Sequence, residues 1–332
     1  MNYIGSKLKL CQDFLPTTIK SVCGEDLSQK TFCDIFAGTG IVGRTFKTSV
    51  KKVIANDIEY YSYVLNKNYI GNQQPIDNKL QLIEELNALP PISNGFIYNN
   101  YCLGGNGERQ YFSDANGKKT DTMRTAIECW KQNGRIADNA YYFLLCSLLE
   151  CADKVANTAS VYGAYLKKLK KSAQKDLILE PAEFELDNNA HQIFNKDANE
   201  LIKEIEGDIL YLDPPYNARQ YGANYHLLNT IAEYKPFEPS GKTGLRQYYK
   251  SKYCSAGSVK NEFENLIKNA KFKYIFLSYN NEGLMTVGDV KSIMSKYGRY
   301  DLAQTDYQRF KADSNRFNKA DSTVEYLHIL EK

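Results

Sequence analysis

The feature that most constrains the fold of this chain is an apolar run that ends in a glycine-rich turn. Residues 31–36 are mostly apolar, Gly38 and Gly40 follow, and residues 41–46 contain no helix breaker except glycine. This order predicts a strand, a tight turn and a helix. Residues 52–57 repeat the strand pattern and end in an acid. The beginning of the chain therefore predicts a parallel sheet with helices packed on it.

The alternation of strand and helix is interrupted in the middle of the chain. It stops near Gly71 and resumes near His191. Between these points lies long helical patterning, over residues 120–171. We therefore predict an α/β domain made of residues 1–71 and 190–332, with a mostly helical insert of residues 72–189.

The remaining elements are predicted from the same periodicities. Apolar residues at helical spacing indicate helices, and short apolar runs between breakers indicate strands. The last two runs of the chain are expected to form an antiparallel pair, at 299–307 and 322–330. Helices are expected at 8–21, 59–67, 198–205 and 286–296, and further strands at 191–197, 208–212 and 272–278.

The composition is that of a large folded domain. Of the 332 residues, 43% are hydrophobic and 24% are charged, which is enough to bury a sizeable core. No apolar run approaches the roughly 20 residues of a membrane helix, and the N-terminus lacks a signal-peptide pattern, so we expect a cytoplasmic protein. The 8 cysteines include no Cys-x-x-Cys pair and the 3 histidines are scattered, so we expect no metal site.

Two acids near the glycine-rich turn indicate the kind of ligand. A turn at the carboxyl end of a strand is where open α/β sheets bind ligands, since glycine lets a ligand approach the backbone. Asp34 precedes the turn, and its carboxylate suits a cation better than a pyrophosphate. Asp57 is placed to accept hydrogen bonds from ribose hydroxyls, as in both NAD and S-adenosylmethionine sites. The pair favours S-adenosylmethionine, with a dinucleotide site and a ligand-free turn as alternatives.

The most informative stretch for function is Asp213-Pro214-Pro215-Tyr216, directly after an apolar strand. Consecutive prolines fix two φ angles, remove two donors and hold the preceding residues extended. Such a rigid segment at the edge of a sheet can present a carboxylate and carbonyl oxygens outward. The alternative is a surface turn with a fortuitous pair of prolines. It is disfavoured because strand, acid, prolines and aromatic ring coincide downstream of a cofactor motif.

This segment suits methylation of an exocyclic amino group. The nitrogen is a poor nucleophile because its lone pair is delocalised into the ring. The Asp213 carboxylate and the Pro214 carbonyl can accept its two hydrogens and favour a pyramidal nitrogen aimed at a methyl group. A sulfonium donor is already reactive, so positioning carries most of the acceleration. Tyr216 is expected to stack on the target base, which must leave the duplex.

The order of these segments resembles that of the amino-methyltransferases of restriction–modification systems, in the alpha arrangement of Dam-type adenine methylases. There a Lys-containing segment, a Gly-x-Gly turn, a recognition domain and Asp-Pro-Pro-Tyr follow one another, as residues 3–7, 34–40, 72–189 and 213–216 do here. Residues 213–226 and 277–283 further resemble the FokI- and NlaIII-type modification methylases. The resemblance implies a Rossmann-like S-adenosylmethionine-dependent methyltransferase sheet with an inserted target-recognition domain. It also implies a bacterial enzyme that methylates adenine N6, since cytosine-N4 enzymes usually carry Ser in place of Asp213.

The resemblance also implies which residues bind the methyl donor. Asp197 takes the position that holds the adenosine ring, although an Asp before a helix is often only an N-cap. The donor-binding residues implied in this way are Tyr3, Lys7, Asp34, Phe36, Ala37, Gly38, Gly40, Asp57, Ile58 and Asp197.

Basic and aromatic stretches indicate where DNA binds. Residues 167–171 are basic enough to meet phosphates, although a solvated helix end explains them equally well. Residues 109–112 and Arg124 offer side chains that can read base edges. Residues 242–253 form a basic, aromatic stretch that we interpret either as a mobile loop closing over DNA or as an ordinary surface loop. We expect DNA contacts from Arg219, Tyr221, Arg246 and Lys250.

Other functions remain as alternatives at this point. The same chemistry serves cytosine N4 in DNA or adenine N6 in RNA. A DNA-binding module with a relic pocket is disfavoured by the intact Asp34, Asp57 and Asp213, and a nicotinamide oxidoreductase leaves Asp-Pro-Pro-Tyr without a role. The expected partners are double-stranded DNA and a separately encoded cognate restriction endonuclease. We expect a monomer, and the resemblance to NlaIII-type enzymes implies a short palindromic target such as CATG.

Overall fold

The computed structural model describes residues 7–308 and 322–332, so the predicted donor-binding residue Tyr3 lies outside the described part of the chain. The chain divides into two compact units. We call the first the sheet unit; its described residues fall within 7–66, 187–220 and 249–332. We call the second the helical unit; its described residues are Lys67–Leu186 and Tyr221–Tyr248.

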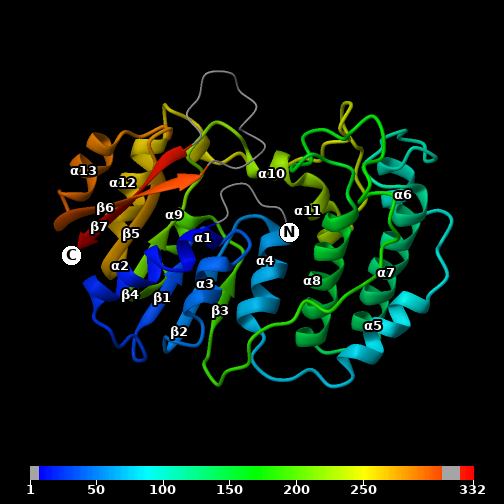
Figure 1. Cartoon of the computed structure of the whole chain (residues 1–332), viewed down its shortest axis with the longest axis horizontal. Coiled ribbons are helices and arrows are strands. Elements are labelled where there is room, and N and C mark those ends of the chain that lie inside the picture. Colours follow the sequence, from blue (N-terminus) through cyan, green and yellow to red (C-terminus); the bar gives the residue numbers. More distant parts are fainter. Residues whose placement is uncertain (1–6, 309–321) are drawn as a thin grey trace. The chain divides into compact units, whose positions relative to one another are not determined.

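The sheet unit is built on a seven-stranded sheet with the order β3-β2-β1-β4-β5-β7-β6 (Figure 1). Neighbouring strands from β3 to β5 are parallel, and β7 runs antiparallel between β5 and β6. The chain moves outward from β1 in one direction and from β4 in the other, and ligands of open α/β sheets bind at such a switch point. The strands are Thr31–Asp34 (β1), Lys52–Asn56 (β2), Gln192–Phe194 (β3), Glu206–Leu212 (β4), Lys271–Asn280 (β5), Arg299–Gln308 (β6) and Ser322–Glu331 (β7).

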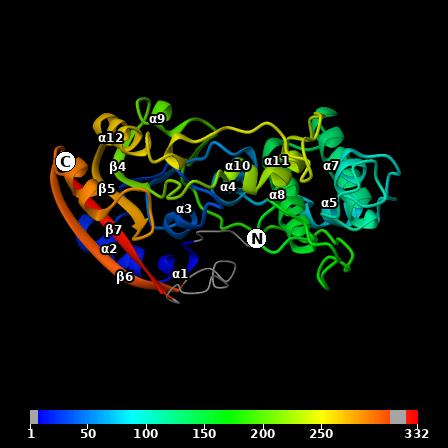
Figure 2. The same cartoon turned by 90° about the horizontal axis from the view of Figure 1, so that it is seen from above.

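Helices cover both faces of this sheet, as the connections between parallel strands require. Figure 2 shows α9 and α12 on one side of the sheet and α1 and α2 on the other. Leu210 and Leu277 pack with Phe263 of α12 on the first side, and Phe32 stacks on Phe46 of α3 at 4.5 Å on the second. The helices of this unit are Leu8–Cys11 (α1), Phe14–Cys23 (α2), Ile41–Phe46 (α3), Tyr60–Asn66 (α4), Ala198–Leu201 (α9), Lys252–Cys254 (η2, a 3₁₀ turn), Val259–Asn269 (α12) and Val287–Met294 (α13).

The helical unit contains no strand of the main sheet among its described residues. Two long helices, α7 and α8, pack against each other, and α11 packs against α8. Asp121 of α7 accepts hydrogen bonds from the amides of Ile97 and Tyr98, both at 2.8 Å, and so satisfies free donors in the first turn of α6. The elements of this unit are Lys67–Gly71 (η1, a π-helix), Lys79–Ala88 (α5), Phe96–Tyr101 (α6), Asp114–Gln132 (α7), Asp138–Val155 (α8), Tyr221–Asn224 (α10) and His226–Glu233 (α11).

The helical unit differs from the predicted insert 72–189 slightly at its ends, which lie at Lys67 and Leu186, and by one added segment. Residues 221–248 belong to it, whereas the sequence pattern placed them in the α/β domain. Arg124 of α7 donates to the carbonyls of Ile231 and Ala232, at 2.9 and 3.0 Å, and binds this segment at the end of α11. A contact of this kind leaves no local sequence pattern, which is why the segment was assigned by its position in the chain alone.

The helical pattern predicted over residues 120–171 was wrong beyond Val155, where α8 ends. The side-chain amide of Asn157 donates to the carbonyls of Gln110 and Leu166, both at 2.9 Å, and its oxygen accepts from the amide of Lys170 at 3.0 Å. These bonds hold the following chain in a loop. The basic stretch 167–171 therefore lies in a loop and not at a helix end.

The predicted antiparallel pair at the end of the chain is confirmed as β6 and β7. The helix expected at 198–205 ends at Leu201, and α12 was not predicted. None of the described helices is long and apolar enough to cross a membrane.

Candidate cofactor and catalytic site

Three acids lie at the carboxyl ends of neighbouring parallel strands in the sheet unit. Asp34 ends β1 and lies opposite Tyr211 of β4 in the strand register. Asp213 follows β4 directly, and Asp57 follows β2. Since the carboxyl ends of parallel strands meet at one edge of a sheet, the three carboxylates that the sequence singled out come together there.

The glycine-rich turn between β1 and α3 depends on left-handed backbone. Gly38 and Gly40 have φ angles of 53° and 76°, which side chains with a Cβ rarely adopt. The turn is tied to its neighbours, because the Gly38 amide donates to Asp57 Oδ2 at 2.8 Å and its carbonyl accepts from the side chains of Ser62 and Asn66. The conformation of the turn after β1 is thus stabilised by Asp57, which follows β2, and by two side chains of α4.

Asp34 is the clearest indication of a charged ligand. It is 1% exposed, and neither of its carboxylate oxygens has a hydrogen-bond partner among the described residues. Burial, and then the charges of Asp213 and Asp57, raise the pKa of Asp34 well above its usual value. A buried carboxylate without a partner is costly. A cationic group placed here would offset that cost, as the ammonium of S-adenosylmethionine can.

Asp57 lies among several hydrogen-bond donors. Its Oδ1 accepts from the Glu59 amide at 2.9 Å and its Oδ2 from Gly38 at 2.8 Å, and the Ile58 amide and the Ser62 side chain also act to lower its pKa. Burial raises the pKa of Asp57. Ile58, next in the chain, is 36% exposed and Ala37 of the turn is buried.

Asn56 orders the edge of the sheet, and sequence reasoning missed it. It is 1% exposed. Its amide donates to the carbonyls of Ile35 and Lys196, at 3.0 and 3.1 Å, and its oxygen accepts from the Lys196 amide at 3.0 Å. Asn56 therefore joins the ends of β1 and β3 to β2. A polar residue at the end of an apolar run, directly before an acid, was the signal for it.

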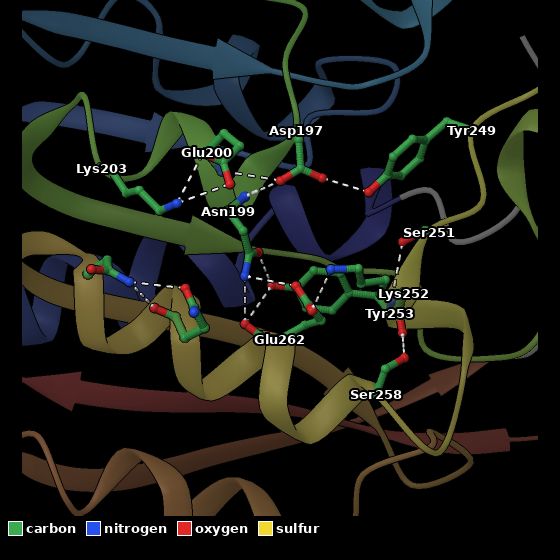
Figure 3. Close-up of polar contacts among 12 residues, drawn as sticks. Asp197, Asn199, Glu200, Lys203, Tyr249, Ser251, Lys252, Tyr253, Ser258 and Glu262 are labelled. Atoms are coloured by element: carbon green, nitrogen blue, oxygen red, sulfur yellow. Dashed lines mark hydrogen bonds and ion pairs between the residues drawn. The ribbon is translucent and has the colours of Figure 1, made fainter.

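Asp197 both caps a helix and offers an oxygen to a further donor. Its Oδ1 accepts from the amides of Asn199 and Glu200 at 2.9 and 3.2 Å, so it is the N-cap of α9. Its Oδ2 accepts from the hydroxyl of Tyr249 at 2.7 Å. Figure 3 shows the carboxylate between these two sets of donors. The N-cap alternative therefore holds, and the predicted contact with adenosine requires Oδ2.

Two tyrosines of the predicted basic loop lie beside Asp197. The Tyr253 hydroxyl donates to Asn199 Oδ1 at 2.8 Å, and its ring packs edge-on against Phe36 at 5.1 Å. The Ser251 amide donates to Gln220 Oε1 at 2.8 Å, which links this segment to the chain after Asp-Pro-Pro-Tyr. The end of the stretch 242–253 is thus fixed to the sheet unit (Figure 3).

The Asp-Pro-Pro-Tyr segment is packed against the core and tied to the chain after β5. Pro214 is buried and Tyr216 packs partly buried against the core. The Leu284 amide donates to the Tyr216 carbonyl at 3.0 Å. The Asp213 side chain keeps 21% exposure and lies 3.3 Å from the Lys7 ammonium. Burial raises the pKa of Asp213 to about 6, with Lys7 acting in the opposite direction and Glu325 in the same one.

Lys7 bridges two carboxylates. Its Nζ donates to Glu325 Oε1 at 2.6 Å as well as facing Asp213. The Ser278 hydroxyl donates to the same Oε1 at 2.7 Å. Burial lowers the pKa of Lys7, but the charges of Asp213 and Glu325 outweigh it and hold that pKa well above its usual value. Sequence reasoning missed Glu325 and Ser278; a Glu within an apolar strand was the available signal.

The four predicted DNA-contact residues are divided between the units. Arg219 and Lys250 are exposed in the sheet unit. In the helical unit, Tyr221 stacks on Tyr225 at 6.0 Å, and Arg246 pairs with Glu233 at 2.9 Å. DNA contact stays a prediction for all four, and Arg246 must leave an ion pair to make it.

The predicted base-reading side chains are largely committed to the fold. Arg124, one of the side chains offered as able to read bases, is 3% exposed and binds backbone carbonyls. Tyr111 and Phe112 are fully buried. Arg109 donates to the carbonyls of Asn100 and Gly241, both at 3.0 Å. The two arginines donate to backbone carbonyls, whereas Tyr111 and Phe112 fill the core of the helical unit.

Three features define this protein as a Rossmann-like S-adenosylmethionine-dependent methyltransferase. Its parallel sheet has one antiparallel strand inserted near the edge, a buried acid without a hydrogen-bond partner precedes the glycine turn, and Asp-Pro-Pro-Tyr follows β4. Within that class, the chain belongs to the D12 class N6 adenine-specific DNA methyltransferase family, whose model matches residues 3–293.

Named relatives agree with this family. The chain is 66% identical to the type II methyltransferase M.NlaIII of Neisseria lactamica, covering 100% of this chain and 99% of that protein. It is 38% identical to M.CviAII of Paramecium bursaria Chlorella virus 1, over 94% and 93% of the two chains. It is 37% identical to M.FokI of Planomicrobium okeanokoites, over 100% of this chain and 53% of that protein.

The family settles the alternatives that the sequence left open. The protein transfers a methyl group from S-adenosylmethionine to N6 of adenine in DNA. Cytosine N4, RNA, a relic pocket and hydride transfer are not favoured. Within 7–308 and 322–332, no group of three or more His, Cys, Asp or Glu side chains is placed to hold a metal ion.

Proposed function

We propose that Asp213 and Pro214 bind the amino group of the target adenine, while Asp34, Asp57 and Asp197 hold S-adenosylmethionine. One observation carries this assignment: Asp34 and Asp213 lie at the ends of neighbouring parallel strands. Their carboxylates are so close that the charge of Asp213 raises the pKa of Asp34. The acid suited to the donor's ammonium therefore lies beside the acid suited to the nucleophile.

The residues of this chain promote methyl transfer mainly by positioning the adenine amino group. S-adenosylmethionine supplies a methyl group on a cationic sulfur. With a pKa of about 6, Asp213 is mostly ionised at neutral pH and accepts one amino hydrogen. The Pro214 carbonyl accepts the other, since the prolines around it hold it rigidly. Tyr216 stacks on the base. The two acceptors hold the amino nitrogen in line with the methyl group and so raise the rate.

The remaining donor contacts follow from the site. Gly38 and Gly40, with Phe36, Ala37 and Ile58, surround the nucleoside part of S-adenosylmethionine. Asp57 accepts from the ribose hydroxyls, and Asp197 Oδ2 accepts from the adenine amino group of the donor. These roles are supported by the left-handed glycines, by the position of Asp57 at the end of β2 and by the second lone pair of Asp197 Oδ2. Tyr3 is assigned only through the family resemblance.

For DNA, we assign target recognition to the helical unit, Lys67–Leu186 and Tyr221–Tyr248. Arg219 and Lys250 contact phosphates, and Tyr221 and Arg246 act beside the displaced adenine. The relatives are type II methyltransferases, which supports a short duplex target and a separately encoded cognate endonuclease, against which methylation protects. The protein acts as a monomer in the cytoplasm.

The test of the catalytic assignment is Asp213→Ala. The variant should bind S-adenosylhomocysteine with wild-type affinity in calorimetry and lose methyl transfer by about a thousandfold or more. Glu206→Ala, exposed at the other end of β4, is the matched control and should keep full activity. A fully active Asp213→Ala enzyme would refute the assignment.

The target is tested by sequencing that maps methylated adenines in DNA from cells expressing the protein. We expect one short palindrome, methylated on both strands, and resistance of that DNA to an endonuclease with the same target. Methylation scattered without a common sequence would contradict the recognition role. Sedimentation of the free protein tests the monomer.

A further inference from the structure

One face of the sheet carries a row of polar side chains beside the catalytic carboxylate. Tyr211 of β4 lies in register with Phe276 of β5, and Asn280 of β5 with Glu325 of β7. Because side chains alternate along a strand, Tyr211, Ser278 and Glu325 project from the same face. Asp34 shares this face through its pairing with Tyr211. Four neighbouring strands thus contribute polar side chains to one face of the sheet, next to Asp213.

Lys7, directly before α1, places its ammonium among these polar side chains. It lies between Glu325, at 2.6 Å, and Asp213, at 3.3 Å. The Lys7 and Glu325 side chains are 8% and 4% exposed, while Asp213 is 21% exposed. Lys7 and Glu325 are thus the inner pair, and Asp213 is the outer partner, the most exposed of the three. Charges this deeply buried persist only when they are paired and hydrogen-bonded, and Ser278 provides the additional bond to Glu325.

The unequal distances matter for the reaction. A lysine that faced Asp213 alone would bind its carboxylate closely and occupy lone pairs that the adenine amino group requires. Glu325 competes for the same ammonium and holds it at the shorter distance. Lys7 is then close enough to favour the ionised form of Asp213 without closing over it.

We propose that Glu325 is a positioning residue for methyl transfer: it holds Lys7 back from Asp213, so that the Asp213 carboxylate keeps free lone pairs for the amino group. The inference rests on the proposed role of Asp213 as acceptor. The charged and titratable groups around Asp213 are Lys7 before α1, Cys11 on α1, Asp34 on β1, Tyr211 on β4 and Glu325 on β7.

The test is the rate of methyl transfer in a single turnover, measured against pH in Glu325→Gln. This variant keeps the shape of the side chain and removes its charge, so Lys7 should move onto Asp213. We expect the rate to fall about tenfold or more. We also expect the acid limb of the pH profile to move to lower pH by about half a unit or more, because the negative charge that raised the Asp213 pKa is gone.

Two further variants separate positioning from simple stability. Glu325→Asp keeps the charge, so its acid limb should stay near that of the wild type even where the rate falls. Lys7→Met should move the limb the other way, to higher pH, because Asp213 loses its cation. Glu331→Gln, the same substitution on the same strand outside the network, is the control and should leave both rate and limb unchanged.

The outcomes distinguish this inference from the function on which it rests. If Asp213→Ala is inactive and Glu325→Gln matches the wild type in rate and acid limb, Glu325 has no positioning role. A slower Glu325→Gln enzyme with an unmoved limb, and equal loss in Glu325→Asp, would also overturn it in favour of a structural role. If Asp213→Ala retains transfer, the acceptor assignment itself fails.

Discussion

At the scale of single residues, the sheet unit places negative charge where folding alone does not favour it. Asp34, Asp57 and Asp213 all have pKa values raised by burial. A carboxyl whose pKa is higher in the folded than in the unfolded protein binds more protons when folded, so its contribution to stability falls as pH rises through the window between the two values. For Asp213 that window runs from an unfolded value of about 4 to about 6. The free energy that burial of these carboxylates costs in folding is offset when the proposed ligands bind to them.

Asp34→Asn should therefore stabilise the free protein and abolish donor binding. The substitution removes a buried charge without a hydrogen-bond partner. We expect the free energy of unfolding to rise by about 1–3 kcal/mol near pH 8, measured by denaturant titration. The gain should shrink toward acid pH, where the wild-type carboxyl takes up its proton. A destabilised variant, or one that still binds S-adenosylhomocysteine tightly, would contradict the assignment of Asp34 to the donor's cation.

At the scale of elements, short helices at the sheet edge depend on their caps. The four-residue helix α9 begins at Asp197, whose two oxygens have separate tasks. The sequence predicted a helix from Ala198 and an acid before it, and both are present. It did not predict that the helix would end at Leu201 or that Tyr249 would reach the same carboxylate, because the latter contact spans 52 positions of the chain.

The two tasks of Asp197 can be separated by substitution. Asp197→Asn keeps an oxygen for the N-cap and replaces Oδ2 by a donor, so stability should change little while affinity for S-adenosylmethionine falls about tenfold. Asp197→Ala should lose the affinity and also about 1 kcal/mol of stability. Thermal unfolding and calorimetry measure the two effects. Equal affinities in wild type and Asp197→Asn would remove Asp197 from the donor site.

At the scale of the whole molecule, the chain builds two units from interleaved segments. Residues 221–248 join the helical unit although they follow the catalytic segment directly. Arg124 of α7 joins this segment to the rest of the helical unit. It donates to two carbonyls at the end of α11 and pairs with Glu128 at 2.8 Å.

Arg124→Leu should thus weaken the helical unit and spare the sheet unit. Two carbonyls lose their partner in a buried place, and we expect a loss of about 2–4 kcal/mol in the unfolding of that unit. DNA binding should fall, while affinity for S-adenosylhomocysteine should stay within about twofold of wild type. Ala115→Leu, exposed in the first turn of the same helix, is the control. Equal loss of donor binding would show that the two units do not unfold separately.

The sequence by itself determined the chemistry and the local frame of this protein. Glycines that need left-handed backbone, two consecutive prolines and acids at the ends of apolar runs constrain the chain over a few residues, so their consequences can be read locally. The strand, turn and helix at 31–46 and the position of Asp213 after β4 follow from such constraints.

Only the tertiary structure decided which distant side chains share a site. Lys7 and Glu325 are separated by 318 positions, and no local pattern links them. Arg124 is a residue type that can read base edges, but it is buried and binds backbone carbonyls. The physical reason is the same in both cases. Burial and hydrogen-bond partners depend on which segments the fold brings together, whereas backbone preferences act within a segment.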